Sequence, residues 1–281
     1  MILLSGTKVS AKIRKQLAQE SAEFLKSRRR APGLAVVIVG EDPASHVYVK
    51  NKIKACEEVG FRSFHHHLPA TVSEAEVLER IQSLTDNPEV DGMLVQLPLP
   101  KHLSSERILA TISPLKDADA LTIENQGLLF AGRPRVKPCT PAGVIEILKH
   151  YDIPIAGQNA VVVGRSAIVG RPMAQLLLME DATVTCAHSK TRDLRDITSR
   201  ADIVVVAAGK PRFLGADDFK KDSVIIDVGI HRLFDGLCGD VRFEELRAFA
   251  RAATPVPGGV GPMTITMLLK NTLQLAHLRK N

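Results

Sequence analysis

The sequence lacks the features that mark a membrane-spanning or secreted protein. No apolar run approaches the roughly 20 residues that a transmembrane helix needs. The first residues lack the charged and then apolar layout of a signal peptide, so we expect none. The four cysteines are scattered and form no CxxC pair. This spacing disfavours a disulfide framework and a structural zinc site, and it favours a reducing, cytoplasmic location.

Positively charged residues are in modest excess over negatively charged ones. Aromatic residues are scarce, since the chain has no tryptophan and two tyrosines. The formal net charge is +6, and the densest basic run, three arginines at 28–30, has no aromatic residues between its charges. We therefore predict no nucleic-acid partner, although a positive excess attracts anionic small molecules. Three histidines at 65–67 lie in an alternating strand pattern. Because neighbouring side chains point to opposite faces of a strand, we expect no metal site there.

The hydrophobic pattern alternates between strand and helix in both halves of the chain. The 281 residues, 45% of them hydrophobic, are enough for two domains with their own cores. In the first half we predict strands at 33–40, 62–68 and 90–97 and helices at 45–59 and 73–84. In the second half the predicted strands lie around Ala160, Ala182, Ile203, Val224 and Thr254. Strands that alternate with helices predict the α/β class, with parallel sheets and right-handed crossovers.

The alternation breaks down between residues 114 and 140, where glycine, proline and charged residues dominate. We interpret this segment as the junction between two domains, and we predict that a new helix follows it at 142–150. The predicted domains are an N-terminal parallel-sheet α/β domain, residues 1–138, and a C-terminal Rossmann-like domain, residues 139–263. An amphipathic helix at 264–281 is expected to pack back on the first domain.

The most informative segment runs from Val161 to Pro172. Three β-branched residues lead into Gly164, and a proline opens the apolar segment that follows, which predicts a buried strand, a tight turn and a helix start. Such a turn aims backbone N–H groups and the positive end of the helix dipole at one point, which suits a phosphate. The spacing Gly164-x-Ser166-x-x-x-Gly170 departs from the usual G-x-G-x-x-G, so an ordinary strand-to-helix turn remains the alternative.

The next predicted strand ends without the acidic residue that binds the ribose of NAD in dinucleotide folds. Ser189 and Lys190 stand there instead, and Arg165 lies in the glycine turn itself. A carboxylate would repel a 2′-phosphate, whereas a guanidinium and a hydroxyl group can hydrogen-bond it. The sequence therefore favours NADP over NAD. For Lys190, a solvated loop charge explains the residue equally well.

Ligands of open α/β sheets bind beyond the carboxyl ends of the strands, which selects further residues. One such end is Val95-Gln96-Leu97, and the most unusual one is the loop at 255–262. Its prolines remove backbone donors and its glycines permit close approach to a ligand, with a stiff connector as the alternative. Tyr48 and Lys52 are four residues apart on one face of a predicted helix, although packing of the lysine stem beside the tyrosine is the default explanation.

Six motifs in order along nearly the whole chain resemble those of the methylenetetrahydrofolate dehydrogenase/cyclohydrolase family. They are Tyr48-x-x-x-Lys52, Gln96-Leu-Pro-Leu-Pro100, Lys116-Asp-Ala-Asp119, Pro138-Cys-Thr-Pro141, Gly164-Arg-Ser-x-x-Val-Gly-x-Pro172 and Pro255-Val-Pro-Gly-Gly-Val-Gly-Pro-Met-Thr264. The resemblance implies a cytoplasmic homodimer that oxidises 5,10-methylenetetrahydrofolate to 5,10-methenyltetrahydrofolate with NADP. It also implies hydrolysis of that product to 10-formyltetrahydrofolate, with the preference for polyglutamylated folates left open.

Carried over by motif, the resemblance gives Lys52 the main catalytic role, with Gln96 hydrogen-bonded to it. Tyr48 would stack on or orient the folate, and Asp119 would anchor the pterin ring. The residues implied for NADP are Gly164, Arg165, Ser166, Ser189 and Ile230. The residues implied for the folate are Tyr48, Lys52, Val95, Gln96, Leu97, Asp119, Pro257, Gly258, Gly259 and Val260. Hydrolysis needs an activated water, which a lysine with a lowered pKa can supply.

Two positions depart from the family pattern. Ala120 stands where the family usually has glycine, and if that glycine is needed for a positive φ, alanine would shift Asp119. His231 replaces a frequent asparagine. Two alternative functions remain, a two-domain quinate- or amino-acid-type NADP dehydrogenase and a non-catalytic NADP-binding regulator. The first does not explain the glycine-rich loop, and the second has no need of a lysine at a ligand site.

Overall fold

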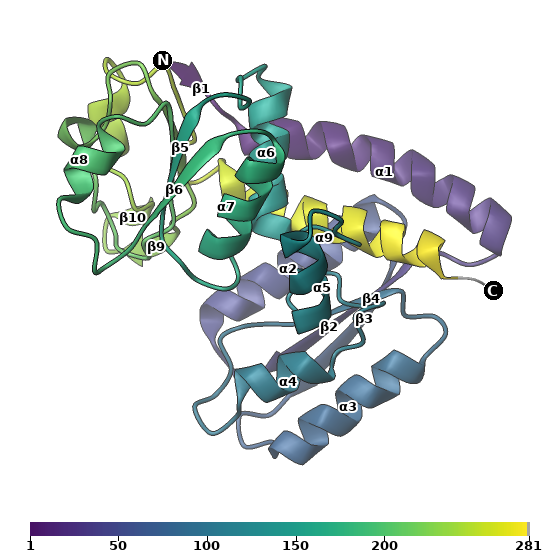
Figure 1. Cartoon of the computed structure of the whole chain (residues 1–281). Coiled ribbons are helices and arrows are strands. Elements are labelled where there is room, and N and C mark those ends of the chain that lie inside the picture. The colour runs from purple at the N-terminus through teal and green to yellow at the C-terminus, as the bar shows by residue number, and fades with distance from the viewer. Residues whose placement is uncertain (280–281) are drawn as a thin grey trace. The chain divides into compact units, whose positions relative to one another are not determined.

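The computed structural model describes residues 1–279, and for residues 43–48 it describes the backbone only. The chain forms two compact units. Unit 1 consists of Met1–Ala11 and Thr140–Thr264, and unit 2 consists of Lys12–Cys139 and the residues from Ile265 onwards. Each unit is an α/β structure built on a parallel sheet (Figure 1). Among the described residues, no helix combines the length and the apolar character needed to cross a membrane.

The sheet of unit 2 has three parallel strands in the order β3-β2-β4. The central strand, β2 (Gly33–Val39), is buried along its whole length, as expected for a continuous apolar run. It is flanked by β3 (Arg62–Leu68) and β4 (Gly92–Val95). The helices that lie wholly in unit 2 are α2 (Pro43–Glu58), α3 (Glu74–Asp86), α4 (Ser105–Thr111) and α5 (Ile123–Phe130).

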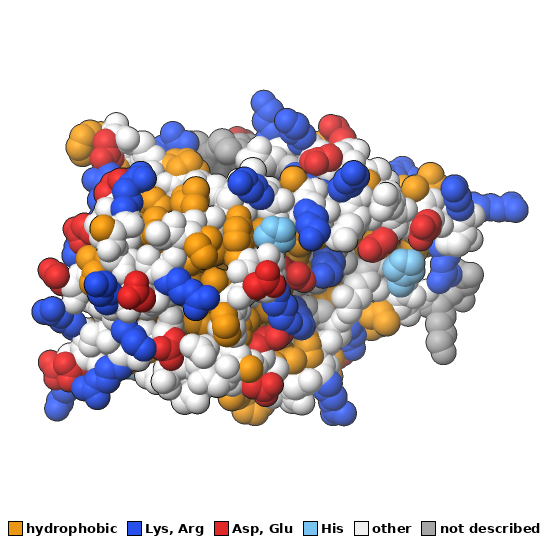
Figure 2. Space-filling view, turned by 90° about the horizontal axis from the view of Figure 1, so that it is seen from above, with side chains coloured by type: hydrophobic (Ala, Val, Ile, Leu, Met, Phe, Trp, Pro, Cys, Tyr) orange, Lys and Arg blue, Asp and Glu red, His pale blue; other side chains and the backbone are white. Residues whose placement is uncertain are grey.

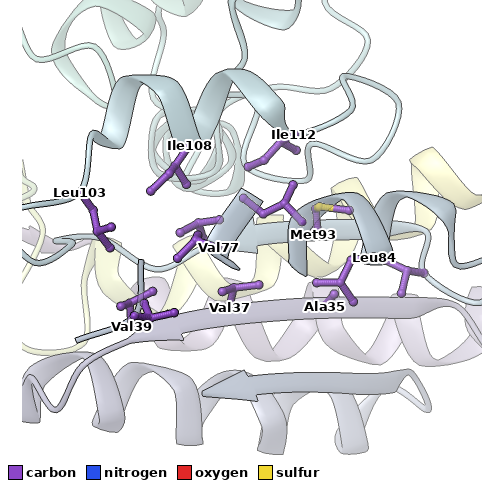
Figure 3. Packing of buried hydrophobic residues seen from close by; sticks show 13 residues of the cluster. Ala35, Val37, Val39, Val77, Leu84, Met93, Leu103, Ile108 and Ile112 are labelled. Atoms are coloured by element: carbon purple, nitrogen blue, oxygen red, sulfur yellow. The ribbon is translucent and has the colours of Figure 1, made fainter. Parts of the chain in front are cut away.

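A core of 13 buried hydrophobic residues fills the space between this sheet and the helices α3 and α4 (Figure 3). Val37 of β2, Val77 of α3 and Ile108 of α4 are each 0% exposed. Burial of a side chain of this kind stabilises the fold by about 1.5–3 kcal/mol. The start of α3 is fixed by Ser73 and Glu76, which form a reciprocal capping box.

Unit 1 contains a six-stranded parallel sheet in the order β1-β11-β8-β7-β5-β6. Its strands are β1 (Ile2–Leu3), β5 (Asn159–Val163), β6 (Thr183–Ala187), β7 (Ile203–Val206), β8 (Val224–Asp227) and β11 (Ala252–Ala253). A separate antiparallel hairpin consists of β9 (His231–Leu233) and β10 (Gly236–Cys238). The shorter helices are α6 (Cys139–His150), α7 (Gly170–Met179) and α8 (Leu194–Thr198), with 3₁₀ turns at Ala216–Asp218 and Phe243–Leu246. The interiors of β5, β7 and β8 are apolar and buried, which is why these strands were predictable.

The two longest helices, α1 (Gly6–Arg28) and α9 (Val260–Leu278), each contain residues of both units. Within unit 2 their later parts lie side by side (Figure 1). Arg14 Nε donates a hydrogen bond to Thr266 Oγ1 at 3.0 Å, and the Phe24 and His277 rings meet edge to face with centroids 5.2 Å apart. The C-terminal helix therefore packs against the first part of the chain, as the amphipathic pattern predicts.

The compact units and the predicted domains differ at the N-terminus. Residues 1–11 belong to unit 1 and not to the first predicted domain. The physical reason is strand pairing, since β1 pairs in parallel with β11, Ile2 opposite Ala252 and Leu3 opposite Ala253. A strand of two residues is too short to give a hydrophobic period, so the sequence did not reveal it.

Helix α5 lies in the segment where the sequence predicts a break in the strand–helix alternation, with Thr122 as its N-cap. Its end residues Ile123 and Phe130 are 77% and 80% exposed, so its apolar residues do not share one buried face and no helical period is visible. Other differences are at element ends: α2 begins at residue 43 rather than 45, β4 covers 92–95 of the predicted 90–97, and α9 begins at 260, inside the predicted loop.

Candidate active site and nucleotide site

The residues predicted to do chemistry lie where the sheet of unit 2 reverses its strand order. β3 and β4 lie on opposite sides of β2, so the chain crosses over β2 between them. Open α/β sheets bind their ligands at the carboxyl ends of the strands beside such a reversal. Gln96 directly follows β4, and α2, the helix after β2, carries Lys52. Both residues therefore reach the same end of the sheet.

The side chains of Lys52 and Gln96 are in direct contact. Lys52 Nζ donates a hydrogen bond to Gln96 Oε1 at 2.7 Å, and Gln96 Nε2 donates to the carbonyl oxygen of Leu97 at 2.7 Å. The second bond fixes which atom of the amide faces the lysine. Lys52 is only 7% exposed, and lysines are almost never this buried without a partner. The hydrogen bond that the resemblance implied is thus present.

Burial and charge act on Lys52 in opposite directions. Burial lowers the pKa of the Lys52 ammonium group because the charged form loses its water, and the negative charge of Asp119 opposes this change. Burial likewise raises the pKa of the Asp119 carboxyl group, and the positive charge of Lys52 opposes that change. The two groups are therefore close enough to influence each other's protonation. A lysine that releases its proton nearer neutrality can accept one from a water molecule.

Asp119 lies in a turn that is tied to the sheet and to the C-terminal helix. Met93 N in β4 donates to the carbonyl oxygen of Lys116 at 2.6 Å, and Ala118 N donates back to Met93 O at 3.2 Å. The carbonyl oxygen of Ala118 also accepts a hydrogen bond from Asn271 Nδ2 of α9 at 2.8 Å. The backbone on the N-terminal side of Asp119 is therefore fixed from two elements.

Ala120, one of the two departures from the family pattern, has a φ of +57°. The left-handed conformation that the sequence analysis expected of a glycine is thus present, at a cost of about 1–2 kcal/mol for an alanine. The next residues hold the turn, because the buried Asp117 carboxylate accepts hydrogen bonds from Leu121 N at 3.1 Å and Thr122 N at 2.8 Å. These two bonds hold the residues after Ala120, and they therefore stabilise the turn that contains it.

The remaining folate residues divide between the two units. Val95 and Leu97 flank the end of β4 in unit 2, whereas Tyr48 lies on α2 and its side chain is outside the described residues. The other four, Pro257, Gly258, Gly259 and Val260, lie in unit 1 at the start of α9. There the carbonyl oxygen of Gly258 accepts a hydrogen bond from Thr7 N at 3.1 Å. For all of these residues the role toward the folate stays a prediction.

Unit 1 has the same kind of reversal at β5, which lies between β6 and β7. The turn after β5 is tight, because Gly164 has a φ of +136° and a Cβ atom there would lie 2.2 Å from the carbonyl oxygen of Ala207. A Cβ atom on Gly170, the first residue of α7, would lie 2.3 Å from the carbonyl oxygen of Gly164. Both positions therefore require glycine, and they bring the start of α7 close to the end of the strand.

This turn fits a phosphorylated dinucleotide. Ser166 Oγ accepts hydrogen bonds from Val169 N at 3.2 Å and Gly170 N at 3.3 Å, which orders the start of α7 and its positive dipole end. Arg165 is exposed in the turn, and Ser189 is exposed just beyond β6, where residues 187–192 include no acid. An exposed guanidinium and hydroxyl without a carboxylate match the 2′-phosphate that distinguishes NADP from NAD. Ile230, beyond β8, is 43% exposed.

Sequence reasoning missed two buried carboxylates at this edge of unit 1, Asp227 and Asp240. They are 3% and 0% exposed, and His231, the second departure from the family pattern, lies with its Nε2 atom 2.6 Å from Asp240 Oδ1. The sequence offers only a weak indication of this pair. Nearby glycines indicate that some group packs closely against the backbone, but they do not identify that group. Nothing in a single sequence pairs residues this far apart along the chain.

Comparison with known proteins places both halves of the chain in one family. The catalytic-domain model of tetrahydrofolate dehydrogenase/cyclohydrolase matches residues 4–119, and the NAD(P)-binding-domain model of the same family matches residues 138–280. The bifunctional protein FolD of Bdellovibrio bacteriovorus is 58% identical over 281 residues, which cover 99% of this chain and 98% of that protein.

Two solved structures are similar over the whole length. The bifunctional FolD methylenetetrahydrofolate dehydrogenase/cyclohydrolase from Campylobacter jejuni is 47% identical with a TM-score of 0.96, covering 100% of both chains. The Trypanosoma brucei methylenetetrahydrofolate dehydrogenase-cyclohydrolase, complexed with NADP cofactor and inhibitor, is 39% identical with a TM-score of 0.95, covering 100% of this chain and 99% of that one. The chain therefore belongs to the tetrahydrofolate dehydrogenase/cyclohydrolase family.

Proposed function

We propose that this chain oxidises 5,10-methylenetetrahydrofolate with NADP and hydrolyses the methenyl product to 10-formyltetrahydrofolate, with Lys52 as the residue that handles protons. The observation that carries the proposal is the buried Lys52 Nζ held 2.7 Å from Gln96 Oε1. Family membership supports both activities and not the quinate- or amino-acid-type alternative. A regulator that only binds NADP would not need a desolvated lysine beside a carboxylate.

The hydrolytic step requires that a water molecule lose a proton as it attacks the methenyl carbon. Because burial lowers the pKa of Lys52, a larger share of its Nζ atoms carry a free lone pair near neutral pH. Gln96 Oε1 takes one N–H of the amine and so restricts rotation about the Cε–Nζ bond. A positioned base of this kind typically accelerates such a step by about 10²–10⁴-fold.

The oxidative step depends on alignment, since it moves no proton to the protein. NADP, when bound, accepts the hydride from the folate carbon. Arg165 and Ser189 would bind its 2′-phosphate, and the residues that would hold the rest of it are Gly164, Ser166 and Ile230. Asp119 would accept hydrogen bonds from the pterin ring. Fixing both reactants in this way removes much of the entropic cost of bringing them together.

We further propose that the chain forms a homodimer. The β9–β10 hairpin exposes large apolar side chains, with Phe234 103% and Leu237 40% exposed. Large exposed apolar patches on soluble proteins commonly mark association surfaces, and a second copy of the chain is the partner we expect. Light scattering should give twice the mass of one chain, and Phe234→Ser should shift the population toward the monomer. A monomeric wild-type protein at micromolar concentration would contradict the dimer.

The proposed location is the cytoplasm, and the proposed substrates include polyglutamylated folates. The four cysteines are free thiols, which supports a reducing compartment.

The net charge of +6 supports attraction of the polyanionic tail of a polyglutamylated folate. On the face shown in Figure 2, Lys and Arg side chains stand among Asp and Glu side chains rather than in one continuous patch. This mixture supports small anionic ligands over a nucleic acid.

The direct test uses purified protein with methylenetetrahydrofolate and NADP, following NADPH and the methenyl chromophore together. We expect NADPH to appear while the methenyl species stays low. With methenyltetrahydrofolate supplied and no cofactor added, the chromophore should decay faster than in buffer. Failure to form NADPH would contradict the dehydrogenase, and decay at the buffer rate would contradict the cyclohydrolase.

A further inference from the structure

Two carboxylates are buried in unit 1 where β8 and the hairpin meet the nucleotide edge. Asp227, the last residue of β8, is 3% exposed, and Asp240, two residues beyond β10, is 0% exposed. Neither is among the residues that the family resemblance assigned to the cofactor. A buried charge without partners would be strongly destabilising, so the partners of these two groups indicate what they do.

Asp240 accepts hydrogen bonds from three consecutive backbone N–H groups. Its Oδ2 atom accepts from Ala208 N at 2.6 Å and Gly209 N at 2.9 Å, and its Oδ1 atom accepts from Lys210 N at 3.0 Å. These donors form the loop that follows β7. The Oδ1 atom also accepts from His231 Nε2 at 2.6 Å, at the start of β9. One carboxylate therefore ties the loop after β7 to the hairpin after β8.

Asp227 holds the backbone of Asp240 in place. Its Oδ1 atom accepts hydrogen bonds from Gly229 N and Asp240 N, and its Oδ2 atom accepts from Val241 N, each at 2.9 Å. Burial raises the pKa of Asp227 to about 6, so at neutral pH the carboxylate is still ionised and accepts all of these bonds. The segment after β8 and the backbone of Asp240 are thus fixed by the same group.

Glycines make room for both carboxylates. A Cβ atom on Gly229 would lie 2.4 Å from Asp240 Oδ1, and one on Gly239 would lie 1.9 Å from Asp227 Oδ2. Neither glycine has a positive φ, so the requirement is space and not backbone conformation. The sequence therefore has glycine at both positions where a side chain would push the carboxylates away from the backbone that they hold.

The order of the strands shows which part of a dinucleotide this arrangement serves. Along the sheet the order is β6-β5-β7-β8. In a dinucleotide fold the end of the second strand, here β6, binds the adenosine ribose, and the glycine turn, here after β5, binds the pyrophosphate. The other half of the dinucleotide then lies beyond the ends of β7 and β8. Those two ends carry the loops that Asp240 and Asp227 hold.

We propose that Asp240 is a positioning residue for the nicotinamide half of NADP, because it holds the loops after β7 and β8 in the arrangement that this half contacts. The inference rests on the proposed function, since it assumes that the glycine turn binds NADP. Asp240 does not touch the cofactor and acts through Ala208–Lys210 and the segment that ends in Ile230. His231 contributes the fourth hydrogen bond to the same carboxylate.

The test compares two ligands by calorimetry, NADP and 2′,5′-ADP, which contains only the phosphorylated adenosine half. Asp240→Asn keeps the shape but replaces one acceptor oxygen by an N–H₂ group that faces the backbone donors. We expect it to weaken NADP roughly 10- to 100-fold, the loss typical of a charge-assisted hydrogen bond. Its affinity for 2′,5′-ADP should stay at the wild-type value, because that half lies over β5 and β6.

Two further variants make the result decisive. Asp217→Asn removes a carboxylate from an exposed position in the 3₁₀ turn of the same unit, and it should leave both affinities unchanged. If Asp240→Asn does not fold, His231→Ala removes one of the four bonds and should weaken NADP several-fold while 2′,5′-ADP is unaffected. Equal losses of both ligands, or no loss of either, would overturn the positioning role. A wild-type protein that binds neither ligand would instead show that the proposed NADP site is wrong.

Discussion

The strand ends of the two units share a topology and differ in what they present. Each unit has a central strand, β2 or β5, with the next strand of the chain on one side and the following one on the other. In unit 2 that edge carries a buried lysine and a carboxylate whose charges act on each other. In unit 1 it carries a tight glycine turn, a helix start and an exposed arginine.

The difference agrees with the two kinds of chemistry proposed for the two edges. Proton transfer needs side chains with shifted pKa values, and burial shifts the pKa of Lys52. Phosphate binding needs fixed N–H donors and a cation that stays charged, which the backbone of the glycine turn and the exposed Arg165 would supply. Substitutions at the two edges should therefore affect different steps.

Lys52→Met should have the largest effect, and it acts on the edge of unit 2 alone. Methionine fills a similar apolar volume but has no amine, so methenyltetrahydrofolate hydrolysis should fall by about 10²–10⁴-fold. NADP affinity should remain at the wild-type value. Lys54→Met, at an exposed position on the same helix, is the matched control and should change neither quantity. Wild-type hydrolysis by the Lys52 variant would mean that this lysine has no role in proton transfer.

Arg165→Ala should have the next largest effect, confined to the edge of unit 1. Loss of a charge-assisted hydrogen bond to the 2′-phosphate should weaken NADP roughly 10- to 150-fold and NAD far less. Arg171→Ala, at an exposed position in the first turn of α7, should alter the ratio of the two affinities little. Equal losses of NADP and NAD in the Arg165 variant would place the 2′-phosphate elsewhere.

Asp119→Asn tests the effect of the Asp119 charge on folate binding and on the pKa of Lys52. The amide keeps the shape but loses the negative charge, so the KM for the folate should rise about tenfold while the Kd for NADP stays constant. The charge of Asp119 also favours the ammonium form of Lys52, so its removal should lower the pKa of Lys52 further. The pH midpoint of hydrolysis should then move to lower pH. A move to higher pH would contradict the assignment of Lys52 as the base.

Ala120→Gly should have the smallest effect, and it acts on the turn beside Asp119. Glycine adopts the φ of +57° without the steric cost of alanine, so the free energy of unfolding should rise by about 1 kcal/mol. Urea denaturation measures this change. Ala131→Gly, where φ is −74°, is the matched control and should not stabilise the protein. A loss of stability in the Ala120 variant would show that the left-handed turn carries no strain.

The parts of the molecule that were predictable depend on local patterns. The buried strand β2 follows from one continuous apolar run, and the nucleotide turn follows from β-branched residues, two glycines and a proline within twelve positions. The contact between Lys52 and Gln96 was implied by the motifs of the family rather than by any period. Roles for both residues came from the same resemblance.

The parts that were not predictable depend on contacts between distant residues. The pairing of β1 with β11 joins residues about 250 positions apart and moves the first residues into the other unit. Asp240 holds a loop about 30 residues earlier in the chain. None of these contacts leaves a period or a spacing in the sequence.

The claim that the two edges have separate functions is tested most directly by measuring the same two quantities on the Lys52→Met and Arg165→Ala proteins. Hydrolysis of supplied methenyltetrahydrofolate, with no cofactor present, and the Kd for NADP are measured on both. The Lys52 variant should lose hydrolysis and keep NADP binding, and the Arg165 variant should keep hydrolysis and lose NADP binding. If either substitution impaired both quantities to a similar extent, the two edges would not have the separate functions assigned to them.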